Sequence, residues 1–184
     1  MRNILKTSVA FTFMFLSGLT AQNLQIVHLD GVYDLDNDDL VEFISFEQGR
    51  ETGGVVSRVA YYEIDDLGFP QLIWNLDAPQ QIDGSIVAAR ITDLDGSGTA
   101  ELFIAANVRT PDNPGLSQGV IYVYDWIDGG FSKAPALSTA LTGPQSGQAI
   151  SNVDIIDLEG DGKEEVAIAL TGPEAVVTVI GLSH

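Results

Sequence analysis

The sequence predicts an all-β fold built from repeated units, and three observations lead to that prediction. A nine-residue acidic pattern occurs three times, with starts that lie 59 and 64 residues apart. Each copy leads directly into a short apolar segment rich in β-branched and aromatic residues, which are typical of strands. After residue 21, no segment of useful length shows a helical period. Four expected strands in each of the first two units, which are roughly sixty residues long, indicate the blades of a β-propeller.

The expected strands divide the chain into three units, at residues 22–78, 79–143 and 144–184. Turn residues separate the apolar segments, for example at residues 66–68 and 128–130. The first two units offer four strands each and the third offers three, so we expect two full four-stranded blades and an incomplete third. The expected strands are residues 24–29, 40–46, 55–64 and 69–74, then 86–91, 102–106, 120–126 and a weak segment at 131–137, then 149–156, 166–170 and 176–180.

The first 21 residues have the order of a secretory signal peptide. Arg2 and Lys6 give a positive start, residues 9–16 are apolar, and residues 17–21 are small apart from Leu19. The apolar run is shorter than the ~20 residues that a membrane-spanning helix needs. We therefore expect an exported protein that is secreted, held at the cell surface or periplasmic, with no membrane span after signal cleavage.

Composition excludes several classes of site. The chain has 8 Lys+Arg against 26 Asp+Glu, a formal net charge of -18, and no Cys. Without cysteine, a thiol nucleophile, a disulfide framework and a Cys-ligated zinc site are impossible. The negative charge repels phosphate backbones and argues against nucleic acid as a partner. Half of the acidic residues lie in the three repeated patterns, so the charge is concentrated there.

The three acidic patterns, at residues 34–42, 93–101 and 157–165, predict calcium loops. Oxygen-donating side chains stand at positions 1, 3, 5 and 9, and calcium takes ~6–8 oxygen ligands from carboxylates, backbone carbonyls and water. With the carbonyl of position 7 added, the predicted ligands are Asp34, Asp36, Asp38, Leu40 and Glu42 in the first loop, Asp93, Asp95, Ser97, Thr99 and Glu101 in the second, and Asp157, Glu159, Asp161, Lys163 and Glu165 in the third.

Two alternatives compete with a calcium loop of this kind. Asp and Gly are ordinary turn residues, so the patterns could be solvated acidic turns. Three copies with matched spacing, each followed by an expected strand, argue against that reading. An EF-hand is excluded because its twelfth loop position needs a bidentate Glu, and here that position holds Ser45, Ile104 and Ile168. Gly98 and Gly162 at position 6 predict a left-handed backbone there.

The third pattern and its flank carry a family resemblance. Residues 157–169 read Asp-Leu-Glu-Gly-Asp-Gly-Lys-Glu-Glu-Val-Ala-Ile-Ala, and Thr171-Gly172-Pro173 follows. This resembles the FG-GAP/VCBS repeats of integrin alpha-subunit propellers and of many secreted bacterial proteins. The resemblance implies a Ca²⁺ site on each blade and ligand binding at loops on the opposite face. The sequence departs from the family with Glu at position 9 in all three loops, with Ser97, and with Asp39 at position 6.

Other residues give weaker signals. His28 lacks a second histidine inside the fold, which favours a structural role. Residues 107–118 contain two prolines and a glycine and predict a long exposed loop. The strand aromatics are expected in the core, with sugar stacking as the alternative; they are Tyr61, Tyr62, Trp74, Tyr122, Tyr124 and Trp126.

Three functions remain open from the sequence. The first is a secreted calcium-binding propeller module for protein or glycan binding or adhesion. The second is the propeller part of a polysaccharide lyase or hydrolase, although few basic residues and one internal histidine are available to build an active site. The third is a structural array in a larger surface protein, with neighbouring blades of a longer chain as partners. We also expect that this chain alone does not close a ring, because propellers typically use 4–8 blades.

Overall fold

The computed structural model describes residues 25–51, 54–76, 82–110, 113–141, 148–172 and 176–181. The expected signal peptide at residues 1–21 lies outside these ranges. Within them the chain forms twelve strands, all paired antiparallel, and no helix. A helix able to cross a membrane is therefore also absent from the described ranges. The all-β prediction is confirmed.

The strands form three successive meanders, which we call the first, second and third blades. Each pairs its strands in chain order, as a propeller blade does. The first blade comprises β1 (Gln25–Tyr33), β2 (Val41–Glu51), β3 (Gly54–Ile64) and β4 (Pro70–Asn75). The second comprises β5 (Ile82–Thr92), β6 (Glu101–Thr110), β7 (Asn113–Ile127) and β9 (Leu137–Ala140), and the third β10 (Ala149–Ile156), β11 (Glu165–Thr171) and β12 (Val176–Ile180).

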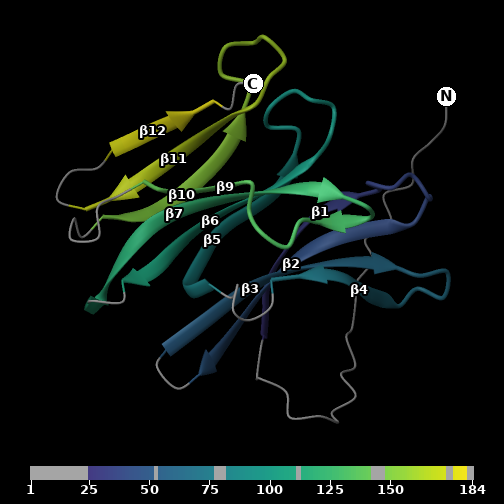
Figure 1. Cartoon of the computed structure of the whole chain (residues 1–184), viewed down its shortest axis with the longest axis horizontal. Coiled ribbons are helices and arrows are strands. Elements are labelled where there is room, and N and C mark those ends of the chain that lie inside the picture. Colours follow the sequence, from purple (N-terminus) through teal and green to yellow (C-terminus); the bar gives the residue numbers. More distant parts are fainter. Residues whose placement is uncertain are drawn as a thin grey trace.

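The blades follow one another through space in chain order (Figure 1), with the first and third at opposite ends. A short pairing of β3 with β5, limited to Val56↔Asp83 and Ser57↔Ile82, joins the first and second blades into one nine-stranded sheet. The third blade forms a separate three-stranded sheet. The strands do not close into a barrel, so the fold is a partial propeller.

Two apolar cores lie between the blades. The first core packs Ile44 and Tyr61 of the first blade against Leu102 and Ile104 of the second. The second core packs the other face of the second blade against the third. Alternation along each strand supplies both faces, since successive side chains point to opposite sides of a sheet. Residues of the second core include Phe103, Ala105, Ile121, Val123, Ile150, Val166, Ile168 and Leu170.

Most of the strand aromatics pack in the first core. Tyr61 and Tyr124 are buried, and Trp74, Tyr122 and Trp126 pack against them half-buried. Phe131 of β8 (Gly130–Phe131), a short strand that pairs with β7, joins this cluster with edge-to-face ring contacts at centroid distances of 5.1–5.5 Å. The expected core role of these side chains is therefore confirmed.

The exposed loop predicted for residues 107–118 is wrong. β6 runs to Thr110 and β7 begins at Asn113, and the two strands pair along most of that stretch. The Asn107 side chain accepts a hydrogen bond from the Ile150 amide at 2.8 Å and donates one to the Ile150 carbonyl at 2.9 Å. This pair of hydrogen bonds between β6 and β10 connects the second blade to the third. The weak strand expected at residues 131–137 is also divided, with Phe131 in β8 and Leu137 in β9.

Candidate metal centre

Each acidic loop joins the first two strands of its blade. The first loop connects β1 to β2, the second connects β5 to β6, and the third connects β10 to β11. Position 1 therefore follows the end of one strand, and the Glu at position 9 stands in or at the start of the next. Each loop therefore begins and ends on two paired antiparallel strands, and this pairing keeps its acidic residues close to one another.

The three loops share one backbone conformation. Position 4 has φ of 62, 74 and 73° at Asn37, Gly96 and Gly160, and position 6 has φ of 68, 86 and 88° at Asp39, Gly98 and Gly162. The left-handed turn expected at position 6 is confirmed. The one at position 4 was missed, although Gly96 and Gly160 were visible signals for it. Left-handed φ costs non-glycine residues free energy, and Asn and Asp tolerate it best.

The Glu at position 9 closes each loop through one carboxylate oxygen. Its Oε2 accepts a hydrogen bond from the amide of position 2, at 2.7 Å for Glu42, 2.9 Å for Glu101 and 2.8 Å for Glu165. The longer side chain of Glu thus reaches back across the loop.

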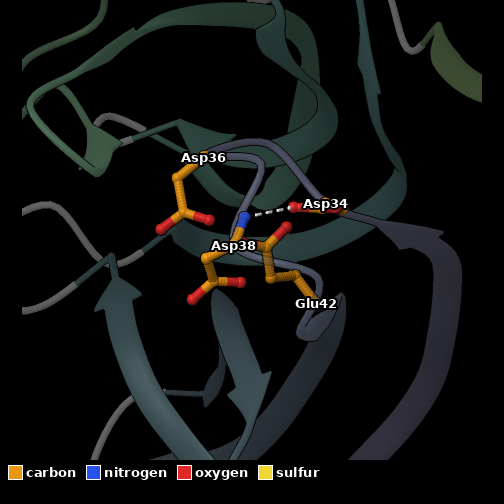
Figure 2. A group of neighbouring side chains, drawn as sticks. All are labelled: Asp34, Asp36, Asp38 and Glu42. Carbon is orange, nitrogen blue, oxygen red and sulfur yellow. Dashed lines mark hydrogen bonds between the residues drawn. The ribbon is translucent and has the colours of Figure 1, made fainter.

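In the first loop four carboxylates come together. One oxygen from each of Asp34, Asp36, Asp38 and Glu42 lies within 4.8 Å of the others. Figure 2 shows the four side chains gathered around the inside of the loop, with the Asp38 amide donating to Asp34 Oδ1 at 3.1 Å. Glu42 is buried and the three aspartates are exposed, so the group is open to solvent on one side.

In the second loop, one carboxylate oxygen from each of Asp93, Asp95 and Glu101 lies within 4.8 Å of the other two. Asp93 Oδ2 accepts the Gly98 amide at 2.9 Å, whereas Asp93 Oδ1 is buried and has no hydrogen-bond partner. A buried carboxylate oxygen without a partner is costly unless a cation or donor satisfies it. The Ser97 hydroxyl accepts a hydrogen bond from the Thr99 amide at 3.2 Å and so supports the backbone of the loop.

The electrostatics of both groups favour a cation. Burial raises the pKa of Glu42 and of Glu101 above the ordinary value, and the neighbouring aspartates add to the rise. Burial also raises the pKa of Tyr61, whose hydroxyl lies beside Glu42 but falls short of hydrogen-bond geometry and has no partner. A cation bound by these carboxylates would favour their charged form and remove the repulsion among them.

The third loop has the shared backbone but does not gather its acids. Among the described residues, Asp157, Glu159, Asp161 and Glu165 form no such group of oxygens. Asp157 uses both oxygens on loop amides, with Oδ1 accepting from Gly160 at 2.6 Å and Asp161 at 3.1 Å, and Oδ2 accepting from Gly162 at 2.8 Å. The structure therefore brings together the predicted acids of two loops and leaves those of the third apart.

The donor set of the first two loops fits a hard divalent cation. It consists of carboxylate oxygens, with the Ser97 hydroxyl nearby, and contains no sulfur or imidazole. Calcium accepts flexible oxygen cages of this kind, whereas zinc prefers nitrogen and sulfur. The carbonyls of Leu40, Thr99 and Lys163 remain predicted ligands.

A comparison with protein families found one match. The family model described as FG-GAP-like repeat matches residues 93–168, from the first aspartate of the second loop into β11. A search of curated proteins found no match to the chain. The matched segment contains the second and third acidic loops, and the first loop repeats their backbone and their Glu contact. Residues 93–168 are therefore similar to an FG-GAP-like repeat, and the first acidic loop shares the loop structure of that segment.

Proposed function

We propose that this protein is a secreted, calcium-binding β-propeller module that binds a protein or glycan partner outside the cell. The observation that carries the calcium assignment is the second loop, where three carboxylates converge and a buried Asp93 oxygen has no partner. The four converging carboxylates of the first loop support it. Export rests on the signal-peptide pattern of residues 1–21.

Calcium would act here as a structural ion. Asp34, Asp36, Asp38 and Glu42 would hold it in the first loop, and Asp93, Asp95, Ser97 and Glu101 in the second, while water completes the shell. The bound ion supplies positive charge that offsets the repulsion among the carboxylates. Because each loop joins the first two strands of a blade, a fixed loop also fixes the start of the second strand.

A protein partner is favoured over a glycan. Side chains that stack on sugar rings must be exposed, and five of the six strand aromatics belong to the first core or pack against it. Tyr62 stacks on Phe43 instead, with ring centroids 5.3 Å apart. A glycan array probed with and without calcium tests the carbohydrate alternative directly.

Thermal unfolding with chelator and with calcium tests the metal assignment. A ligand that binds only the folded state raises stability by about 2.7 kcal/mol per site at ~100-fold excess over its dissociation constant. We expect a chelator to lower the melting temperature, calcium to restore it, and magnesium to compete poorly because it needs a small octahedral cage.

Two variants separate the loops from general charge effects. Asp34→Asn combined with Asp93→Asn should abolish most of the calcium response. Asp66→Asn, at an exposed position in the β3–β4 turn, should leave it unchanged. Equal melting temperatures with chelator and with calcium in the unaltered protein would exclude the calcium sites.

A further inference from the structure

The two cores show how one blade packs on the next. We call the face of a blade that is turned toward the next blade in the chain its forward face, and the opposite face its backward face. In the first core the forward face of the first blade meets the backward face of the second. In the second core the forward face of the second blade meets the backward face of the third. The same contact is thus made twice within one chain.

Strand register identifies the equivalent positions on the forward faces. Counting from the first aspartate of each acidic loop, the eleventh residue is Ile44, Phe103 or Ala167, and the thirteenth is Phe46, Ala105 or Ala169. Their partners on the third strand of each blade follow from the pairing. They are Tyr61 and Val59 in the first blade, Val123 and Ile121 in the second, and Val179 and Val177 in the third.

The third blade exposes the positions that the other two bury. Ile121 and Val123 are 2% and 4% exposed, whereas their equivalents Val177 and Val179 are 69% and 51% exposed. The leucine at position 2 of the acidic loop shows the same contrast, with Leu94 at 2% and Leu158 at 52%. The forward face of the third blade therefore has the positions that pack against another blade, and within the described residues no blade covers them.

The backward face of the first blade carries the complementary surface at the end next to its acidic loop. Phe43 and Tyr62 are paired across β2 and β3, and they correspond to Leu102 and Tyr124, which the second blade buries against the first. Leu72 of β4, paired with Tyr62, and Val41 are exposed beside them. The next pair on this face, Ser45 with Ala60, is small and already buried in the single chain, so the apolar surface open to a partner lies at the end next to the acidic loop.

We propose that a second copy of this chain packs the backward face of its first blade onto the forward face of the third blade. The contact is head-to-tail, and two copies joined in this way at both ends would give a closed ring. The three described blades of each copy would together make six, within the ~4–8 blades of known propellers. The proposal repeats a contact that the chain already makes twice, and it does not depend on calcium binding.

The assembly also has a consequence for the third acidic loop. Leu94 anchors the second loop by packing into the second core, and Leu158 lacks that anchor in the single chain. Packing a blade over Leu158 would bury it as Leu94 is buried. The third loop would then have the same support as the second.

Mass measurement by light scattering on the full chain tests the assembly. We expect the unaltered protein to have the mass of two copies. Val179→Glu breaks the forward face and Leu72→Glu breaks the backward face, and each variant alone should be monomeric. An equimolar mixture of the two should form a one-to-one complex, because one intact forward face and one intact backward face remain.

Matched controls keep the test specific. Ile127→Glu alters a side chain with the same 51% exposure as Val179, but at the end of β7 where it pairs with β8, and should leave the dimer intact. The chain has no cysteine, so Val179→Cys in one copy and Leu72→Cys in another can be joined by a bismaleimide only where the faces meet. Ile127→Cys with Leu72→Cys should give no cross-linked product.

Three outcomes would overturn the proposal. A monomeric unaltered protein at all accessible concentrations would leave the face to a further blade of a longer chain. Dimers of Leu72→Glu alone would show that two forward faces pair with each other. A mixture of folded Val179→Glu and Leu72→Glu that stays monomeric, with circular dichroism like that of the unaltered protein, would exclude the head-to-tail contact.

Discussion

The second and third acidic loops have the same backbone but hold their acids differently. Both have left-handed residues at positions 4 and 6, and in both the Glu at position 9 accepts the amide of position 2. In the second loop three carboxylates converge, and Asp93 keeps one buried oxygen without a partner. In the third loop both carboxylate oxygens of Asp157 accept hydrogen bonds from loop amides. The shared sequence pattern therefore determines the turn without determining whether the acids converge.

The neighbouring blade accounts for the difference. Leu94 of the second loop packs against the third blade in the second core, and Glu101 of the same loop is buried. The Thr92 hydroxyl donates to the Glu164 carboxylate, which places the third loop directly beside the second. Within the described residues no blade follows the third, and Leu158 stands exposed. A preformed site in this repeat thus depends on the packing of the next blade as well as on the loop's own residues.

The largest expected effect comes from the leucines at position 2. Leu94→Ala removes a buried side chain from the second core and should lower the free energy of unfolding by about 2–5 kcal/mol. Leu158→Ala alters an exposed side chain and should cost less than about 0.5 kcal/mol. Urea unfolding of monomeric protein measures both. Similar losses in the two variants would contradict the proposed role of the neighbouring blade.

The next effect separates Asp93 from Asp157, which stand at position 1 of the second and third loops. With chelator, Asp93→Asn should change stability little, because relief of the repulsion among close carboxylates offsets any weakening of the hydrogen bond from the Gly98 amide. With calcium at ~100-fold over its dissociation constant, the same variant should lose about 2.7 kcal/mol. Asp157→Asn should behave in the opposite way, with a loss of about 1 kcal/mol already present in chelator, since its oxygens hold loop amides. Melting curves under both conditions test the contrast.

A smaller effect is expected at position 5. Asp38 in the first loop and Asp161 in the third each accept the amide of position 7, as the Ser97 hydroxyl does in the second. Ser97→Asp should keep that hydrogen bond and add a charge, and calcium affinity rises with ligand charge. A tenfold gain in affinity corresponds to about 1.4 kcal/mol. Calorimetry that shows unchanged affinity would refute the proposed ligand positions, and Ser97→Asn serves as the neutral control.

The smallest effect concerns the first loop, which lacks the glycines of the other two. Asp39 has φ of 68° where the second and third loops have Gly98 and Gly162. Asp39→Gly should relieve strain and raise stability by up to about 1 kcal/mol, less the entropy that glycine loses on folding. Asp39→Ala should destabilise, because alanine tolerates this region poorly. Chelator melts of the two variants should therefore shift in opposite directions.

Much of the fold could be predicted because it depends on local pattern. Expected strands at residues 149–156 and 176–180 coincide with β10 and β12, and the turn at residues 66–68 is present with Gly68 at φ 84°. Alternation of apolar residues marks a strand wherever it lies, and glycine marks a left-handed turn. The acidic loops were placed correctly between strands for the same reason.

The hairpin at β6 and β7 could not be predicted, because Pro111 and Pro114 are ordinary signals of a loop. What keeps β6 extended there is contact with another blade, since Asn107 bonds to the backbone of Ile150, 43 residues away. The residues around Asn107 do not indicate that its side chain has a partner so far away in the sequence. The failure of the third loop to gather its acids has the same origin, because Leu158 has the sequence signal of Leu94 and lacks its surroundings.

The sequence by itself determined the strands, the three loops and the oxygen chemistry of those loops. These follow from side-chain alternation, from glycine at left-handed positions and from carboxylate spacing, all of which act over a few residues. Only the tertiary structure decided which acids converge, which Asp93 oxygen is buried without a partner, and which blade face remains exposed. Those properties depend on what one blade packs against, and packing between blades is a contact between residues far apart in the chain.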